Sequence, residues 1–377
     1  MFGPRFKLFK LFGFQINVDL SWLILFLLLS WSFAANSFPQ ARPGLTTTTY
    51  WVMGVVTALL LFVSIVLHEV SHALAARRYG LPIRGITLFI FGGVAEMTDE
   101  PPTAKSEFVV AIAGPIASIA IGGVCLALWA AGQVGGWPGP VISIAGVLAW
   151  INIALVIFNM VPAFPLDGGR VLRSILWHWK GNLRWATRIT AGIGSAFGTA
   201  LIVLGVLRFI MSGDFLGAWM ALIGLFLRNA ARLSYQQLLL RTALEGEPVS
   251  RFMKTDPVTV PRQISVRELV EEYFLRHHHK LYPVVEGDRL VGCVTTHDIK
   301  QLPREEWDRQ TVGAIAQRRC EENSIAPDTD AMKALAAMSR GRASRLMVVD
   351  GDRLVGILTL KDLLEFFSLK MELEEAA

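Results

Sequence analysis

A long uncharged segment that ends in three ionisable residues places the tightest limit on how this chain can fold. Residues 51–67 (WVMGVVTALLLFVSIVL) carry no charged side chain, and His68, Glu69 and His72 follow at once. A segment of this kind predicts a helix that crosses a bilayer, which takes about 20 residues. Ionisable side chains inside such a helix cost about 2.5–3.5 kcal/mol each, so their presence there indicates a functional site.

The spacing of these residues is typical of a metal site. His68 and His72 are four residues apart, so on a helix they share one face and can bind the same ion. Glu69 lies beside the coordination position that catalytic zinc sites leave open, where a carboxylate can exchange a proton with water. The pattern therefore predicts a metal-dependent hydrolytic site inside a membrane.

The composition divides the chain into a membrane part and a soluble part. The sequence is 53% hydrophobic and 18% charged, which is too apolar for an ordinary soluble protein. Nearly all long apolar runs lie in 17–233, whereas 245–377 alternates charged and apolar residues. The net charge of +5 is not gathered in a basic patch with interleaved aromatic residues, so we expect no nucleic-acid partner. Without C-x-x-C spacing, we expect reduced thiols at Cys125, Cys293 and Cys320.

Six apolar segments are long enough to cross the lipid bilayer; they lie near 17–35, 51–76, 107–131, 140–161, 189–211 and 215–232. Residues 1–10 are basic and precede the first segment, as in a retained N-terminal anchor. Basic residues gather at alternate ends of the segments, while the intervening loops carry only Arg42. This asymmetry predicts a multi-pass protein of the cell membrane with both termini in the cytoplasm.

A shorter stretch, residues 81–98, predicts a strand or a short hairpin, because it is too interrupted to span and rich in β-branched residues. Such a strand beside the site could pair with an extended substrate segment, and a plain cytoplasmic loop is the alternative. Gly114 and Pro115 are interpreted as a helix-packing feature.

A third metal ligand is expected in the segment NMVPAFPLDGG, residues 159–169. Asp167 lies just beyond the fourth predicted span, at the same depth and side as His68, and the prolines end the helix there. Asn159 falls at membrane depth, where an unpaired amide is costly, so it could contact the substrate or an oxyanion. The rival carboxylates, for which solvent exposure is expected, are Glu96, Asp99 and Glu107.

HEVSH together with NMVPAFPLDGG resembles the site-2 protease family of intramembrane zinc metalloproteases, whose signature pairs HExxH with NxxPxPxLDG. The resemblance implies one catalytic Zn²⁺ held by His68, His72 and Asp167. It also implies Glu69 as general base and acid and Asn159 as a substrate or oxyanion contact. The activity implied is regulated intramembrane proteolysis, in which single-pass transmembrane proteins are cleaved inside the bilayer near its cytoplasmic face.

The C-terminal part contains an internal repeat, because GDRLVG at 287–292 recurs at 351–356. Each unit is predicted as helix, strand, turn, strand and helix, with a hairpin turn at 286–288. The duplication resembles a tandem pair of cystathionine-β-synthase (CBS) domains. That resemblance implies an adenine nucleotide such as ATP or AMP, contacted by Thr295, Asp298, Thr359 and Asp362. A structural role or a homodimer contact is the alternative.

We therefore predict a multi-span α-helical membrane protein with a short membrane-associated β segment, followed by a soluble α/β tandem CBS module. The predicted domains are 1–240, 241–308 and 309–377. One alternative is a CBS-regulated membrane transporter, which should show repeated membrane halves that this sequence lacks. Another is an HExxH protease with a glutamate ligand from a later span, but no suitable glutamate lies inside a later predicted span.

Overall fold

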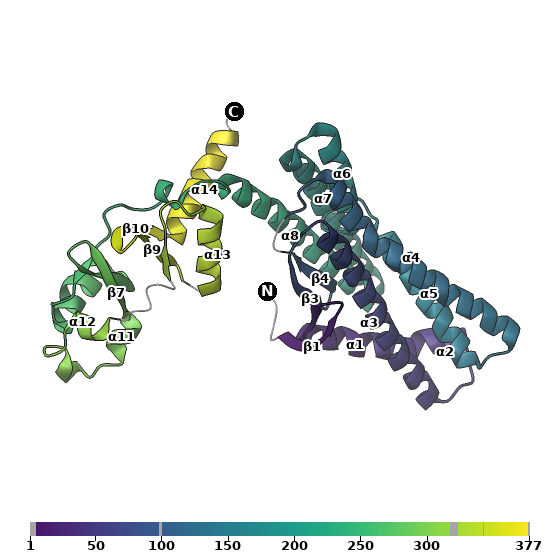
Figure 1. Ribbon diagram of the computed structural model, residues 1–377. Helices are drawn as coiled ribbons and strands as arrows, with labels where there is room; N and C mark the ends of the chain where they lie inside the picture. The colour runs from purple at the N-terminus through teal and green to yellow at the C-terminus, as the bar shows by residue number, and fades with distance from the viewer. Residues whose placement is uncertain (1–4, 98–99, 317–322, 342, 376–377) are drawn as a thin grey trace. The chain divides into compact units, whose positions relative to one another are not determined.

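A computed structural model of the chain describes residues 5–97, 100–316, 323–341 and 343–375 (Figure 1). The chain divides into two compact units, Met1–Gln236 and Gln237–Ala377. The first unit holds the long apolar helices and a small sheet, and the second holds a larger sheet flanked by short helices.

Among the described residues, five helices are long and apolar enough to cross a membrane, one fewer than the six predicted. The first runs from Leu20 to Ala41 as α1 (Leu20–Ser32), a π-helical turn (Phe33–Ser37) and α2 (Phe38–Ala41). The others are α3 (Thr47–Arg78), α4 (Ala104–Gly135), α5 (Gly139–Asn159) and α7 (Leu183–Ser212). Both α3 and α5 pack along α4, and the shorter α6 (Asp167–Lys180) also contacts it (Figure 1).

The sixth predicted span corresponds to the start of α8 (Phe215–Leu244). Its apolar stretch ends at Leu227, before Arg228, and is therefore shorter than the roughly 20 residues that a span needs. The same stretch nevertheless packs antiparallel on α7 through paired glycines. A Cβ at Gly198 would lie 2.7 Å from the Gly224 carbonyl oxygen, and one at Gly205 would lie 2.6 Å from that of Gly217. Close backbone approach at small residues is typical of helix pairs in membranes.

A four-stranded sheet lies against α3. Its strands are β1 (Arg5–Leu11), β2 (Phe14–Asp19), β3 (Ile83–Phe89) and β4 (Gly92–Met97), in that spatial order. The predicted hairpin within 81–98 is present as β3 and β4, so the loop alternative is wrong. The first described residues form a β-hairpin that the sequence analysis did not predict. Apolar side chains of β2 and β3 pack on Val66 and Val70 of α3, which places β4 at the sheet edge beside that helix.

The second unit is a six-stranded sheet built from the two repeats. Its strand order is β5-β6-β7-β10-β9-β8; the strands are β5 (Val260–Pro261), β6 (Leu281–Glu286), β7 (Arg289–Thr295), β8 (Ser324–Ile325), β9 (Arg345–Asp350) and β10 (Arg353–Thr359). The helices are α9 (Val266–Glu268), α10 (Leu275–His277), α11 (Thr296–Lys300), α12 (Val312–Ile315), α13 (Ala331–Gly341) and α14 (Leu360–Glu375).

The repeated GDRLVG turns join the two halves of this sheet. The predicted hairpin turn is present between β6 and β7, and its counterpart joins β9 to β10. Arg289 pairs with Asp352 at 3.1 Å and Arg353 pairs with Asp288 at 3.3 Å. The backbone bonds reciprocate in the same way, from Leu290 to Asp352 and from Leu354 to Asp288. The duplicated sequence therefore forms a pseudo-symmetric pair.

The cysteines differ from the prediction of three reduced thiols. Cys125 on α4 is free, but Cys293 on β7 is disulfide-bonded, so the prediction is wrong for Cys293. A short sequence motif cannot report a disulfide between residues that only the fold brings together. Cys320 lies outside the described residues.

Candidate metal centre

Helix α3 and the first residue of α6 bring two imidazoles and one carboxylate together. Nε2 of His68 and Nε2 of His72 are 3.1 Å apart. The Asp167 carboxylate oxygens lie 3.1 Å from the former nitrogen and 3.3 Å from the latter. In a tetrahedral zinc site with bonds of about 2.0–2.1 Å, neighbouring ligand atoms are about 3.3 Å apart. The three predicted ligands therefore have the separations and the donor chemistry that fit a zinc ion.

Two hydrogen bonds from α4 orient the imidazoles. Nδ1 of His72 donates to the Val110 carbonyl at 2.7 Å. Since a carbonyl only accepts, this bond fixes the tautomer whose Nε2 lone pair is free for a metal. Nδ1 of His68 lies 2.9 Å from Ser118 Oγ. Contacts of this kind fix ring orientation and raise ligand basicity in metal sites.

Gly114, predicted only as a packing residue, lies directly against both imidazoles. A Cβ at this position would overlap Nε2 of His72 and would lie 2.6 Å from Nε2 of His68. Only glycine therefore leaves room for the metal-binding atoms on this side. This role could not be predicted from the sequence, because it depends on which face of α4 meets α3.

We expect Gly114→Ala to weaken zinc binding by at least 10–100-fold, the range seen when groups around a metal site are disturbed. The added methyl would displace one or both imidazoles. Gly123 is a matched control on the same helix, since a Cβ there would meet nothing within 4 Å. Zinc affinity measured by chelator competition should fall for Gly114→Ala and stay unchanged for Gly123→Ala. Equal affinities in both variants would contradict this reading of Gly114.

A cavity of about 430 Å³ reaches the cluster, and His68, Glu69, Asn159 and Asp167 all line it. Most of its other lining residues are apolar and come from α1, α5, α8 and the turn between β3 and β4. The backbone of β4 lies close to the cavity wall, since a Cβ at Gly93 would lie 2.5 Å from Cγ of Glu69. The structure thus places a carboxylate, an amide and an edge strand around one space.

The Asp167 carboxyl is electrostatically suited to remain ionised. Burial alone would raise its pKa, but the adjacent His72 and His68 outweigh burial and lower the pKa below its ordinary value. As the first residue of α6, it also lies at the positive end of a helix dipole. The rival Glu107 is fully buried and paired with Arg173, so the expectation that it is solvated is wrong. The Glu96 side chain and Asp99 lie outside the described residues.

Two further cavities lie within the six-stranded unit. One of about 450 Å³ is lined by Thr359 together with the basic residues Lys254, His279, Arg345 and Lys361. The other, of about 530 Å³, is lined by Thr295 together with His278, Lys280 and Arg345. Burial and the charge of Arg345 lower the pKa of His279.

The four predicted nucleotide contacts form two capping boxes. The Asp298 carboxylate accepts hydrogen bonds from the backbone and hydroxyl of Thr295. Asp362 does the same for Thr359. The threonines line the cavities, whereas the aspartates are not among the described lining residues. A role for all four in ligand binding stays a prediction.

Known proteins resemble both parts of the chain. The family model of Peptidase family M50 matches residues 56–137 and 137–205, and the CBS domain model matches 249–305 and 312–369. Rip3 from Mycobacterium tuberculosis is 34% identical over 362 residues, covering 94% of this chain and 90% of that protein. Zinc metalloprotease MJ0392 from Methanocaldococcus jannaschii is 31% identical over 375 residues, covering 98% of this chain and 97% of that protein.

A solved structure, the site-2 protease from Methanocaldococcus jannaschii, shares 31% identity with a TM-score of 0.43 and covers 62% of this chain and 95% of that one. Fold, site and relatives together define a membrane metalloprotease with tandem CBS domains. The chain belongs to peptidase family M50, the site-2 protease family. It is therefore a metalloendopeptidase of a zinc-dependent family. The predicted family, fold class and enzyme class are confirmed, and the transporter alternative is set aside.

Proposed function

We propose that this protein hydrolyses peptide bonds of single-pass transmembrane proteins inside the bilayer, near the cytoplasmic face. The observation that carries the proposal is the cluster of His68 and His72, on the spanning helix α3, with Asp167, the first residue of α6. The cluster opens into a cavity that Glu69 and Asn159 also line. These three donors would hold one Zn²⁺. The chemistry that a bound zinc ion supplies is that of a Lewis acid, which acidifies water and polarises a carbonyl.

The residues around the ligands supply the remaining parts of peptide hydrolysis. Glu69 takes the proton of the attacking water and returns it to the leaving amine. Asn159, from the end of α5, donates from its amide to the peptide oxygen as negative charge develops there. The free edge of β4 pairs with the substrate backbone and holds it extended, which exposes the scissile bond. The apolar wall of the cavity limits competing water.

The depth of the site follows from its position in α3. His68 precedes the basic end of the helix, Arg77 and Arg78, by roughly 15 Å at 1.5 Å per residue. Positive residues favour the cytoplasmic side, so the site lies toward the cytoplasmic face. The basic residues of α8, Arg228, Arg232 and Arg241, favour the same side. We therefore infer that both termini and the CBS unit lie in the cytoplasm.

The direct test is cleavage by the purified protein in liposomes that contain a panel of single-pass proteins. We expect release of soluble fragments whose new ends, located by mass spectrometry, map to the cytoplasmic half of the transmembrane segment. Cleavage confined to water-exposed loops, or none of the panel cleaved by zinc-loaded protein, would contradict the proposal.

We further propose that the CBS pair binds an adenine nucleotide, which then sets the rate of proteolysis. Four basic side chains line the same cavity as Thr359, namely Lys254, His279, Arg345 and Lys361. Such a set suits a polyphosphate. A homodimer contact is the alternative role of the pair. Cleavage rates that do not change over a wide range of ATP and AMP concentrations would argue against regulation by nucleotide.

We expect Arg345→Ala to weaken ATP binding by about tenfold or more, because a hydrogen bond to a charged group contributes about 1.5–3 kcal/mol. Arg345 lines both cavities of the CBS unit. Arg340 is an exposed arginine on α13 outside both of them, so Arg340→Ala is the matched control. Calorimetric titration of the full-length protein with ATP measures both variants. Equal affinities for ATP would remove Arg345 from the proposed site.

A further inference from the structure

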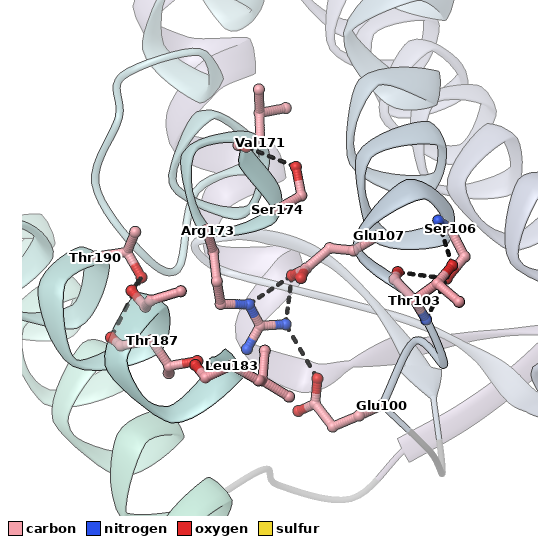
Figure 2. A network of polar contacts seen from close by, with 11 residues as sticks. Glu100, Thr103, Ser106, Glu107, Val171, Arg173, Ser174, Leu183, Thr187 and Thr190 are labelled. Atoms are coloured by element: carbon pink, nitrogen blue, oxygen red, sulfur yellow. Dashed lines mark hydrogen bonds and ion pairs between the residues drawn. The ribbon is translucent and has the colours of Figure 1, made fainter. Parts of the chain in front are cut away.

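Figure 2 shows a buried ion pair that joins α6 to α4. The pair lies close to the candidate metal centre, because Arg173 is on the same helix as Asp167. Arg173 on α6 is 3% exposed and Glu107 on α4 is fully buried. Nε of Arg173 donates to Glu107 Oε1 at 2.5 Å, and a second guanidinium nitrogen contacts the same oxygen. That second nitrogen also reaches Glu100 at 3.0 Å. None of these residues has a place in the chemistry described so far.

A contribution to stability alone does not explain this pair. Removing two charges from water usually costs about as much as their attraction returns, and apolar replacements are often neutral or stabilising. Within the described part of the chain, Glu107 Oε2 accepts no hydrogen bond, so this pair is not fully satisfied. Its presence is better explained by the geometry that it imposes.

That geometry concerns the third ligand. Asp167 and Arg173 lie on the same short helix, about 9 Å apart along its axis at 1.5 Å per residue. The Arg173 guanidinium also lies over the ring of Phe164, 5.1 Å from its centroid, in the turn that leads into Asp167. One side chain therefore holds both α6 and the preceding turn.

Glu107 belongs to the same stripe of α4 that orients the imidazoles. Positions 107, 110, 114 and 118 follow at intervals of three and four residues, so they share one helix face. Val110 and Ser118 bond the imidazoles, Gly114 lies against them, and Glu107 holds Arg173. Helix α4 therefore contacts both the imidazoles of α3 and the helix α6 that carries Asp167.

We propose that Arg173 and Glu107 are positioning residues that set the Asp167 carboxylate at coordination distance from the two imidazoles. The inference rests on the proposed role of Asp167 as a metal ligand. Loss of the pair would let α6 tilt or shift relative to α4. Displacements of about 1 Å are enough to disable a metal or catalytic site.

The test uses the double variant Arg173→Met/Glu107→Met in the full-length protein, because removing both charges avoids leaving one buried and unpaired. We expect zinc affinity to fall about 10–100-fold while the melting temperature of the metal-free protein changes little. The visible absorption spectrum of the Co²⁺-substituted protein should change, because it reports ligand geometry. Substrate cleavage should show a lower kcat with KM nearly unchanged.

Arg208 and Asp214 supply a matched control. They form an ion pair of similar geometry, but the pair is exposed and lies at the C-terminal end of α7. Arg208→Met should leave zinc affinity and the Co²⁺ spectrum unaltered. Should the double Met variant not fold, Arg173→Lys carries the test, because it keeps the charge but loses the Nε donor. It should weaken zinc binding several-fold.

The outcomes separate this inference from the proposed function. A folded double variant with unchanged zinc affinity and an unchanged Co²⁺ spectrum would overturn the positioning role. An Asp167→Ala variant that still binds zinc at full affinity would instead overturn the ligand assignment, and the positioning role with it. Zinc loss in Asp167→Ala with no effect of the double variant removes only the positioning role.

Discussion

Glu69→Gln is expected to abolish peptide hydrolysis while leaving zinc bound at wild-type stoichiometry. Glutamine has nearly the same shape as glutamate but cannot take a proton from water at neutral pH. General acid–base catalysis by one group contributes about 10²–10⁴-fold, so the cleavage rate should fall by at least this range. Zinc should remain because the proposed ligands, His68, His72 and Asp167, are untouched. Initial rates in liposomes and metal content by atomic absorption measure the two effects.

The controls separate proton transfer from other causes. Glu365→Gln changes an exposed glutamate of the CBS unit and should leave both quantities at wild-type values. If Glu69→Gln cleaves within tenfold of the wild-type rate with zinc bound, Glu69 is not the general base. If the Glu69→Gln variant loses zinc, Glu69 contributes to metal binding, and the experiment gives no support for a role in proton transfer.

The part of the site that could be predicted from the sequence is the part whose residues lie close together in the chain. His68, Glu69 and His72 lie on adjacent turns of one helix, so their meeting needs no knowledge of the fold. Asp167 follows 99 positions after His68, and its placement rested on matching membrane depth and on the family resemblance. The structure brings these groups within hydrogen-bond distance.

The residues around the proposed ligands could not be predicted from the sequence, because their roles depend on how the helices rotate against one another. Ser118 and Val110 meet the imidazoles only through the face that α4 turns toward α3. The polar surroundings of Glu107 in the sequence favour a solvated carboxylate. Its partner Arg173 is 66 residues away, and no local pattern links the two.

Two elements of the fold could not be predicted in full from the sequence. In residues 5–11 (RFKLFKL) basic and apolar side chains alternate, which is the period of a strand, but the alternation breaks at Leu8 and Phe9, where the strand has a register shift. For α8, composition alone cannot decide whether the helix crosses the membrane, because Arg228 and Arg232 shorten its apolar run. The structure shows that α8 packs closely on α7 through glycines of both helices.

Asp167→Ala is expected to remove both zinc and activity. The change deletes one of three proposed ligands, so the loss of affinity should exceed the 10–100-fold range of changes around a site. It leaves two imidazole nitrogens 3.1 Å apart and removes the carboxylate that would complete the proposed ligand set. After dialysis against a weak chelator, the variant should hold almost no zinc, and cleavage should be undetectable.

Thermal unfolding provides a second readout that does not depend on finding a substrate. A ligand at 100 times its dissociation constant stabilises the folded state by about 2.7 kcal/mol, so zinc should raise the melting temperature of the wild type. Asp167→Ala should lose this zinc-dependent rise. Asp214→Ala, an aspartate paired with Arg208 at the far end of α7, should keep it. A zinc-dependent rise of equal size in Asp167→Ala would mean that the metal is held by other groups, because a cation cannot stabilise a fold through a ligand that is no longer there.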